Sequence, residues 1–397
     1  MPMKILAIPT TVGLSKPRSG GQNRFSNLLK VQKKENDVVV LEPEHLWDEQ
    51  DRAIAEVYTY RDLDLFSRKL SIFRDLNLDF MRKAYAALKH DQIDIIQITH
   101  PSGALALKAL TLLAGKRIPI VYDAHNIESD FTRQTFADNQ YYSKIERLII
   151  PIYVAALERV ACKHIFTHIT SVSATDAEEL RTRYHLHPDR ICVVPSGCYL
   201  PDQGYGRDKR ALKAELGIDA EKTMVFFHGL YSHPPNRAAF DLIEHEIAPR
   251  FSASQNVQFV IGGTQVPEFE RGNVRSLGFL ENIYSISAAD IAIVPLTTGG
   301  GTKLKIFDYM SVGLPIVTTE KGIEGIEAEN YEHAIIVDGT GDEFIDAIRY
   351  LIENENERRR IGANARGLAE EKYNWDTIGE NLTRIYRDII ERELQPS

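Results

Sequence analysis

Short apolar runs alternate with amphipathic segments along almost the whole chain. In the first half, the runs expected to form buried strands are KILAIP, DVVVLEP, DIIQITH, PIVYDAH, FTHITSVS and RICVVPSG. A second series consists of TMVFFHG, VQFVIGG, ADIAIVPL, LPIVTT and HAIIVDG, and beyond about residue 341 the pattern is purely helical. Strands that alternate with helices are typical of parallel sheets built from βαβ units. The pattern therefore predicts an α/β protein with two Rossmann-like domains.

A stretch between the two series lacks periodicity. It reads VPSGCYLPDQGYGRDKR and is rich in glycine, proline and polar residues, which is typical of a linker. At 397 residues the chain is also long for a single core. We therefore expect a linker near residues 198–206, between an N-terminal domain of residues 1–200 and a C-terminal domain of residues 207–375. Residues 376–397 are expected to form a terminal helix.

The most unusual chemistry lies in residues 295–319, which read PLTTGGGTKLKIFDYMSVGLPIVTT. Three consecutive glycines before Thr302 predict a sharp turn that exposes backbone N–H groups ahead of a helix. Lys303 and Lys305 add positive charge at the start of that helix, where cations are unfavourable unless an anion is bound. Asp308 lies on the same helix face as Lys305 and would suit hydroxyl groups. The segment indicates a phosphate site for a nucleotide-like molecule; a tight turn with solvated lysines is the alternative.

Other candidate residues follow predicted strands. Gly20 and Gly21 follow the first strand, His125 and Asn126 follow PIVYDA, and Gly229 follows TMVFFH. Ligands of open parallel sheets bind beyond the carboxyl ends of the strands. We therefore expect these residues to line a cleft between two sheets whose carboxyl ends face each other. For His125 a hydrogen-bonded structural role is the alternative.

Composition narrows the class of protein. With 43% apolar and 26% charged residues the chain is an ordinary globular protein, and its net charge of −9 argues against nucleic-acid binding. Cys162, Cys192 and Cys198 have no metal-binding spacing, which suits a reducing compartment. The longest apolar run, LIIPIYVAAL at residues 148–157, is about half a membrane span and contains Pro151. We expect a cytoplasmic protein with at most peripheral contact at the inner face of a membrane.

Two further patterns lie between residues 62 and 90. Asp62 and Asp64 form a DxD string, but they lie in a helical pattern without a preceding hydrophobic strand, so no metal site is predicted. Residues 66–90 place three phenylalanines at heptad spacing with basic residues between them, and these are Phe66, Phe73 and Phe80. Such a surface could meet anionic lipid or a lipid-linked acceptor. Packing of the aromatic rings on their own domain is the favoured alternative.

Seven strings in order resemble the retaining glycosyltransferases of family 4, which have the GT-B fold. They are SGGQNRF, YDAHNIESDFTR, ITSVSATDAEEL, ICVVPSG, FFHGLYSHPPNRAAF, SLGFLENIYSISAADIAIVPL and the glycine motif. The terminal YNWDTIGENLTRIYRDI is similar to the last helix of that family, which crosses back onto the N-terminal domain. The resemblance implies two Rossmann-like domains facing across a cleft, with the acceptor in the first and a nucleoside-diphosphate sugar in the second.

The resemblance also implies roles for residues of the second domain. Gly300, Gly301, Thr302 and Lys303 would hold the diphosphate, and Asp308, at a position usually occupied by Glu, would bind the ribose hydroxyls. Leu277, Gly278 and Phe279 match the loop that holds the base through backbone groups, and Gly229 is expected to belong to the same donor site. Gly299 stands where the common pattern has a second Glu, so the identity of the sugar stays open. Arg237 could supplement Lys303, although a solvated arginine at a helix start is the favoured alternative.

In the first domain, the resemblance implies that Gly20 and Gly21 approach the diphosphate and that His125 lies near the transferred sugar. Asn126 and Glu128 would shape that loop. His125 and Lys303 are thus the candidate catalytic residues of a metal-independent, retaining transfer to a glycan or lipid-linked acceptor. No cofactor is expected. The alternatives are a nucleotide-sugar epimerase of the same architecture and a catalytically silent subunit that binds sugar nucleotides.

Overall fold

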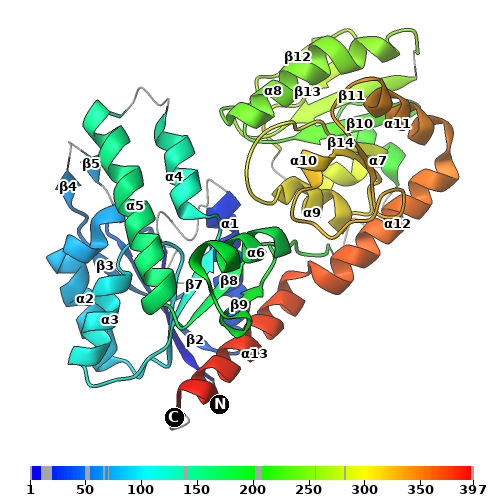
Figure 1. Cartoon of the computed structure of the whole chain (residues 1–397). Helices are drawn as coiled ribbons and strands as arrows, with labels where there is room; N and C mark the ends of the chain where they lie inside the picture. The colour runs from blue at the N-terminus through cyan, green and yellow to red at the C-terminus, as the bar shows by residue number, and fades with distance from the viewer. Residues whose placement is uncertain are drawn as a thin grey trace. The chain divides into compact units, whose positions relative to one another are not determined.

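The computed structural model describes residues 2–9, 20–49, 54–65, 68–69, 71–137, 142–201, 208–254, 256–280 and 283–394. The chain forms two compact units (Figure 1). The first comprises Met1–Ser196 together with Trp375–Ser397, and the second comprises Gly197–Asn374. Each unit contains a seven-stranded sheet with helices packed on it, which confirms the predicted α/β class. Residues 202–206 of the predicted linker and residue 207 lie outside the described residues.

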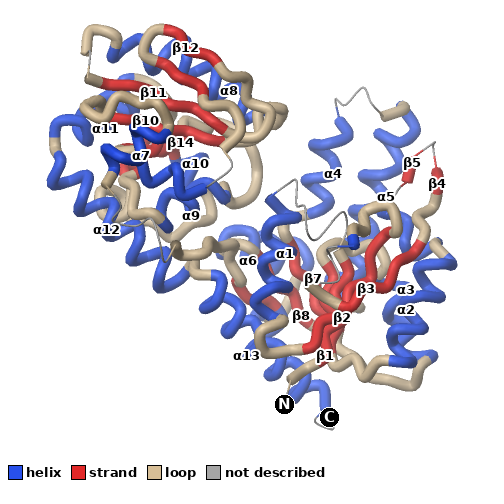
Figure 2. Tube along the Cα trace, turned by 180° about the vertical axis from the view of Figure 1, so that it is seen from behind, coloured by secondary structure: helices blue, strands red, loops and turns tan. Residues whose placement is uncertain are grey.

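The sheet of the first unit is entirely parallel, with strand order β3-β2-β1-β6-β7-β8-β9 (Figure 2). Its strands are β1 (Lys4–Ile8), β2 (Asp37–Pro43), β3 (Glu56–Tyr60), β6 (Ile95–Ile98), β7 (Ile120–Ala124), β8 (His168–Ser171) and β9 (Ile191–Val193). Strands β1, β6, β7 and β8 are buried almost throughout, because helices cover both faces of the sheet. All six strand runs predicted for this half are strands in the structure. Strand β3, at the edge of the sheet, was not predicted.

The helices of the first unit connect its strands and cover the sheet. They are α1 (Gly20–Gln32), α2 (Leu78–His90), α3 (Ala104–Leu113), α4 (Glu128–Ala137), α5 (Lys144–His164), α6 (Ala174–Tyr184) and α13 (Trp375–Leu394), with 3-10 helices η2 (Ser71–Leu76) and η3 (Pro188–Arg190). Helix α13 packs against α1, as the predicted last helix should, and buries Trp375, Leu382 and Tyr386 there. The first unit is thus built from both ends of the chain.

The predicted helical setting of residues 62–90 is wrong at its start. Asp64 begins β4 (Asp64–Leu65), which pairs with β5 (Arg68–Lys69), and the alternation of polar and apolar residues in RDLDL suits a strand. Helix α2 begins only at Leu78, because Asn77 caps it by accepting from the N–H of Phe80. Phe73 and Phe80 are buried in the core, so they form no exposed surface. Phe66 lies outside the described residues.

The sheet of the second unit has the order β12-β13-β11-β10-β14-β15-β16 and is parallel except for the β12–β13 pair. Its strands are β10 (Thr223–His228), β11 (Val257–Gly262), β12 (Phe269–Arg271), β13 (Val274–Ser276), β14 (Ile291–Val294), β15 (Ile316–Thr319) and β16 (Ile335–Val337). Its helices are α7 (Lys209–Glu215), α8 (Pro234–Leu242), η4 (Ile243–Ile247), η5 (Ala248–Phe251), η6 (Ile283–Ala288), α9 (Leu304–Ser311), α10 (Glu320–Ile323), α11 (Asp342–Glu353) and α12 (Glu355–Lys372). The five predicted strand runs are again strands.

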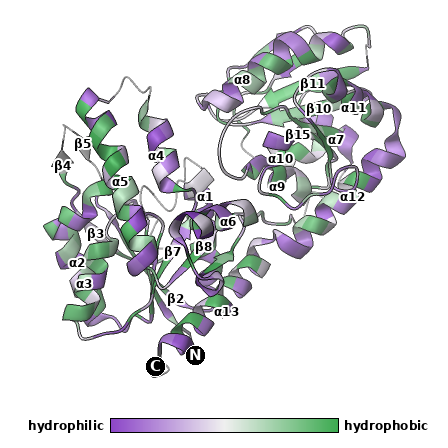
Figure 3. Ribbon diagram, in the orientation of Figure 1, coloured by the Kyte–Doolittle hydropathy of each residue, from purple (hydrophilic) through white to green (hydrophobic). Residues whose placement is uncertain are grey.

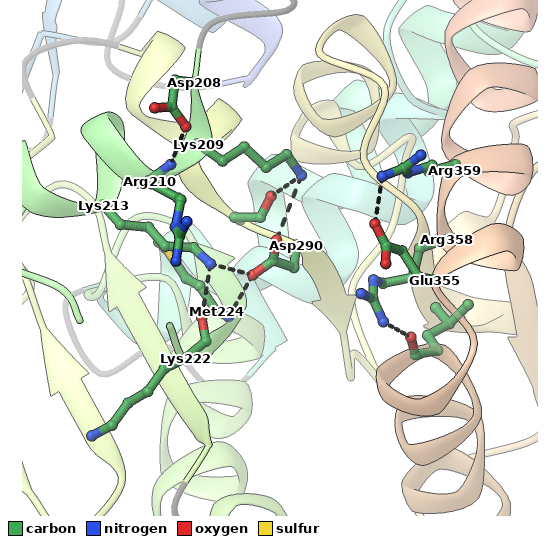
Figure 4. A network of polar contacts seen from close by, with 12 residues as sticks. Asp208, Lys209, Arg210, Lys213, Lys222, Met224, Asp290, Glu355, Arg358 and Arg359 are labelled. Carbon is green, nitrogen blue, oxygen red and sulfur yellow. Dashed lines mark hydrogen bonds and ion pairs between the residues drawn. The ribbon is translucent and has the colours of Figure 1, made fainter. Parts of the chain in front are cut away.

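A charged network fastens α7 to the sheet of the second unit (Figure 4). The carboxylate of Asp290, just before β14, accepts from Lys213 Nζ at 2.7 Å and from the backbone N–H of Met224 at 2.8 Å. Lys209 Nζ donates to the carbonyl oxygen of Ala289 at 2.6 Å. Lys213 is buried, so its paired carboxylate and the carbonyl of Lys222 replace the water that it loses. The network holds the first helix after the linker against β10 and β14.

Candidate active site

In the first unit, a buried carboxylate organises the residues beyond the carboxyl ends of β1 and β7. Asp123 lies in β7, and its Oδ1 accepts from Arg24 Nη2 of α1 at 2.8 Å and from the hydroxyl of Thr170 at 2.9 Å. Its Oδ2 lies 3.0 Å from Nε2 of His125. Arg24 and Asp123 are each about 1% exposed. The predicted site residue His125 is therefore held by a fully buried ion pair.

The same contacts set the pKa of Asp123. Burial by itself would raise the pKa of this carboxyl group, but the Arg24 guanidinium and the His125 ring lower it well below its usual range. Asp123 is therefore a carboxylate at neutral pH. Its Oδ2 orients the His125 ring through Nε2, which leaves Nδ1 on the other side of the ring.

Gly21 lies directly against that free side of the ring. A Cβ atom at this position would approach His125 Nδ1 to 3.1 Å, closer than nine in ten real contacts of this kind. Gly20 is the first residue of α1 and is exposed. The structure thus brings Gly21 and His125 together. Residues 10–19, which lead into α1, lie outside the described residues.

A second polar cluster, also beyond the carboxyl ends of these strands, surrounds Glu128 at the start of α4. Burial, together with the nearby Glu158 carboxylate, raises the pKa of Glu128 to about 8. Glu158 accepts from the backbone N–H groups of Glu128 and Ser129 at 2.9 and 3.0 Å, and so caps α4. His100 Nε2 lies 3.7 Å from Glu128 Oε2, and burial lowers the pKa of His100 to about 3. Glu128 and His100 therefore form a neutral pair near pH 7.

In the second unit, the glycine run forms a turn between β14 and α9, as predicted. Gly299 and Gly301 have φ angles of 104° and 66°, a region that residues with side chains rarely adopt. Lys303 Nζ donates to the carbonyl oxygens of these two glycines at 3.2 and 2.6 Å, and it lies 3.3 Å from Glu324 Oε2. Because the ammonium group binds the loop carbonyls, Lys303 fastens the turn that precedes the helix.

The buried hydroxyl of Thr302 completes this turn. Among the described residues, no donor or acceptor satisfies Thr302 Oγ1. Gly300 has open space where a side chain would lie. Buried polar groups in native proteins nearly always have a partner, so an unsatisfied hydroxyl at a helix start indicates a ligand group or water at this position.

Lys305, expected to add positive charge at the start of the helix, is buried and is not a solvated lysine. Only about 9% of this residue is exposed, and its Nζ donates to Asn236 Oδ1 at 2.7 Å and lies 4.1 Å from the centroid of the Phe227 ring. Burial lowers the pKa of Lys305 to about 7; Asp308 opposes this change and Lys303 adds to it. The face of the Phe227 ring and the side-chain amide of Asn236 offset the loss of water around the Lys305 amino group and allow it to lie inside the protein. A buried amine with a pKa of about 7 therefore lies in the first turn of α9, directly after the glycine turn.

Asp308, the predicted ribose ligand, follows Lys305 on α9. Its side chain is about one third exposed, and its Oδ2 lies 3.4 Å from Nε2 of His228, the last residue of β10. Among the described residues, the other ring nitrogen of His228 is buried without a partner. The exposed part of the Asp308 carboxylate leaves room for a further hydrogen bond. His228 is a site residue that the sequence analysis did not identify.

The remaining predicted residues lie beyond the ends of β10 and β13. The N–H of Gly229 donates to the carbonyl oxygen of Gly262 at 3.1 Å, and Gly278 O accepts from Gly263 at 2.8 Å. Leu277 is half-buried, and Phe279 is 64% exposed. Arg237 places its guanidinium 4.5 Å from the centroid of the Tyr231 ring, and its Nε lies 3.9 Å from Asp241 Oδ2. Within the described ranges, no three His, Cys, Asp or Glu side chains gather in an arrangement suited to a metal ion.

Each half of the chain matches a model of a known protein family. Residues 18–200 match the family model described as Glycosyltransferase Family 4, and residues 222–354 match the one described as Glycosyl transferases group 1. The chain is 20% identical over 246 residues to an MMP alpha-(1->4)-mannosyltransferase of Mycolicibacterium hassiacum, which covers 60% of this chain. It is 23% identical over 290 residues to a D-inositol 3-phosphate glycosyltransferase of Rhodococcus jostii, which covers 68%. These matches span 58% and 61% of the two relatives.

Solved structures share the fold over nearly the whole chain. The crystal structure of Anabaena HepE in complex with UDP-glucose superposes with a TM-score of 0.68 at 16% identity, covering 97% of this chain and all of HepE. The lipopolysaccharide glycosyltransferase WaaG gives a TM-score of 0.68 at 15% identity, covering 96% of this chain and 99% of WaaG. The two family matches and the shared fold lead to the same result: the chain belongs to glycosyltransferase family 4.

Proposed function

We propose that the protein is a retaining, metal-independent glycosyltransferase that moves a sugar from a nucleoside-diphosphate sugar to a glycan or lipid-linked acceptor. The observation that carries the proposal is the glycine turn before α9, where Lys303 binds the loop carbonyls and the buried hydroxyl of Thr302 has no partner among the described residues. This arrangement suits an anion at a helix start. Its neighbours Lys305 and Asp308 suit the rest of a nucleoside diphosphate.

The chemistry of the leaving group explains why such a turn would serve catalysis. Breaking a sugar–phosphate bond develops negative charge on the departing diphosphate and positive charge on the sugar. Backbone N–H groups of the turn and the Lys303 ammonium would stabilise that negative charge where it develops. The acceptor would attack on the face from which the diphosphate leaves, and the departing phosphate oxygen would take the acceptor's proton. The configuration of the sugar would then be retained.

The first unit would supply the acceptor side. His125, held by Asp123 and packed on Gly21, offers an imidazole ring whose orientation is set by these two neighbours. Such a ring would bind a hydroxyl of the transferred sugar or the acceptor. Gly20 and Gly21 would lie near the diphosphate. The nucleotide base would bind to the backbone of Leu277, Gly278 and Phe279.

The donor would be tested first. The purified chain is incubated with a panel of nucleotide sugars, including UDP-glucose, which is the donor in the HepE complex, and thermal unfolding identifies those that stabilise the fold. Slow release of free sugar without an acceptor, with the anomeric configuration of the donor retained on NMR, is the expected result. A donor that binds without any release of sugar would point to a catalytically silent binding subunit. That alternative is considered because Gly299 and Asp308 stand where the family usually has Glu. A changed sugar still attached to the nucleotide would point to an epimerase.

A further inference from the structure

Helix α5 exposes large apolar side chains along one face. Ile145, Leu148 and Ile152 are 58%, 65% and 63% exposed, and Ile149 and Val160 are 47% and 42% exposed. The first four positions recur at helical spacing and Val160 lies about two turns further along the same face, so they form one stripe, which we call the α5 stripe. The opposite face of the helix is buried in the first unit through Ile150, Val154 and Leu157. Figure 3 shows hydrophobic residues along the middle of α5.

Charged residues of α5 are segregated by sign. Both acidic residues turn inward: Glu146 takes part in the capping box with Ser143, and Glu158 binds the backbone at the start of α4. The remaining charged residues of the helix are the basic Lys144, Arg147, Arg159 and Lys163, and His164 ends the helix. Among the described residues, no acid forms an ion pair with Lys144, Arg147 or Arg159. The α5 stripe is therefore flanked by cations and by no exposed acid of its own helix.

A hollow of about 470 Å³ adjoins the stripe at Ile152. The arginines that line it come from three helices: Arg133 from α4, Arg159 from α5 and Arg183 from α6. Asp130 is the acid in its wall, and it binds Arg133 and Arg183 at 2.8 and 2.6 Å. Arg183 also pairs with Glu179 of α6, so three guanidinium groups face two carboxylates and the hollow keeps a net positive charge. Its charge suits phosphate groups.

We propose that the outward face of α5 docks on the surface of an anionic lipid bilayer. The α5 stripe would enter the boundary between headgroups and acyl chains, and the arginine-lined hollow would receive headgroup phosphates. A second copy of the chain fits less well, because a two-fold contact on this face would bring the cations of the two α5 helices together. Among the described residues no helix has the length and apolar character to cross a bilayer, so the contact is with the surface.

This inference gives a role to the apolar run at residues 148–157, which the sequence pattern left without one. It is independent of the proposed transfer reaction, because it needs neither donor nor acceptor. Leu112 of α3 provides a matched control, since it is 64% exposed on the same unit but lies outside the stripe. Arg349 of α11 provides a control for charge, since it is exposed on the second unit and pairs with Asp346.

The test is flotation of the full chain with vesicles. The chain should float with phosphatidylcholine vesicles that contain about one third phosphatidylglycerol and stay behind with pure phosphatidylcholine. Ile152→Glu and Leu148→Glu should each lower vesicle binding at least about tenfold, whereas Leu112→Glu should not change it. Arg159→Gln should weaken binding and its salt dependence, while Arg349→Gln leaves both unchanged. Thermal unfolding confirms that each variant folds, and Ile149→Glu repeats the test should one of them fail to fold.

Several outcomes would overturn the inference. These are no flotation with anionic vesicles, equal flotation with neutral vesicles, and equal loss of binding in Leu112→Glu and Ile152→Glu. A dimer that Ile152→Glu converts to a monomer, without any vesicle binding, would instead assign the face to a second copy.

Discussion

Asp123 joins His125 to Arg24: its Oδ2 lies 3.0 Å from the imidazole Nε2, and its Oδ1 accepts from the guanidinium at 2.8 Å. A single buried carboxylate thus connects the C-terminal end of β7 with α1. The contact to Arg24 compensates the charge of Asp123, and the contact to His125 orients the ring against Gly21. The position of the candidate catalytic histidine therefore depends on an ion pair that no solvent reaches.

Removing the charge of Asp123 should be strongly destabilising. In Asp123→Asn the buried Arg24 guanidinium loses its partner, which costs about 3 to 5 kcal/mol in the free energy of unfolding. Asp376→Asn is the control, because its ion pair with Lys34 is about half exposed and is worth about 0 to 1 kcal/mol. Urea unfolding of both variants measures the difference. Similar losses in the two would contradict the role of the buried pair.

The same pair predicts a pH dependence. The pKa of Asp123 is lower in the folded state than in the unfolded chain, so its contribution to stability is complete above about pH 4. That contribution is lost as the pH falls below this value and the carboxylate takes up a proton. Acid unfolding of the wild type should therefore be steeper below pH 4 than that of Asp123→Asn.

Glu128 should give the opposite dependence on pH. Its pKa is raised from an ordinary 4.5 to about 8 by burial and by Glu158, so the folded state binds its proton more tightly than the unfolded chain does. Stability should then fall as the pH rises through this window, by about 1.4 kcal/mol per unit where the difference is complete. Glu128→Gln, which keeps a neutral side chain, should flatten the melting temperature between about pH 6.5 and 8, above the range in which the lowered pKa of buried His100 adds a slope of opposite sign. A variant that keeps the slope of the wild type would assign it to another group.

Much of the fold follows from the sequence because buried parallel strands are continuous apolar runs. All eleven predicted runs are strands, and they give both sheets. Strands β3, β12 and β13 were missed because they are short and lie at or near sheet edges, where partial exposure leaves no apolar run. The prediction of a helix from residue 62 was wrong because the residues whose helical spacing suggested it belong to separate elements.

The candidate site was less predictable because its contacts join distant residues. Asp123 and Arg24 both occur in strings that resemble the family, but they are 99 residues apart and nothing in either string shows the pair. The sequence places Lys305 at the start of a helix, but it does not show that Asn236, 69 residues away, and the Phe227 ring hold it inside. Side chains that follow a strand can be found from sequence, but their partners require the structure.

Lys303 should be needed for catalysis more than for folding. Lys303→Ala removes the ammonium that fastens the glycine turn and would face the leaving diphosphate, so turnover should fall about 10²- to 10³-fold. Lys321→Ala is the matched control, since Lys321 also pairs with Glu324 but does not contact the turn. Initial rates of sugar release from the donor found in the thermal panel measure both. Unchanged turnover in Lys303→Ala would remove it from the site.

Asp308 should contribute to the affinity for the nucleotide. Asp308→Asn keeps the shape of the side chain but loses the charged acceptor for ribose hydroxyls, so the nucleoside diphosphate should bind about tenfold more weakly. Calorimetry with the free nucleoside diphosphate gives the dissociation constant. Asp346→Asn, an exposed change on α11 of the same unit, should leave that constant unaltered. Equal affinities for wild type and Asp308→Asn would place the ribose elsewhere.

The lowered pKa of Lys305 leads us to expect that a diphosphate binds together with a proton. Burial lowers its pKa from 10.5 to about 7, so the free protein holds a mostly neutral amine at pH 8. A bound diphosphate would favour the charged form and raise that pKa again. Binding of the nucleoside diphosphate at pH 8 should therefore take up a substantial fraction of a proton. Calorimetry in two buffers of different ionisation enthalpy measures this uptake.

His233 is another titratable group whose pKa these lysines change. Burial, Lys305 and Lys303 lower its pKa below 6.5, so it stays neutral at pH 8 unless the ligand raises its pKa by well over one unit. Lys305→Met, which keeps the length of the side chain without its charge, should abolish the uptake, whereas His233→Gln should keep it. Equal binding enthalpies in both buffers for the wild type would mean that no diphosphate charge comes near Lys305. Loss of the uptake in His233→Gln alone would assign the proton to the histidine, and the buried lysine would then serve only to hold Asn236.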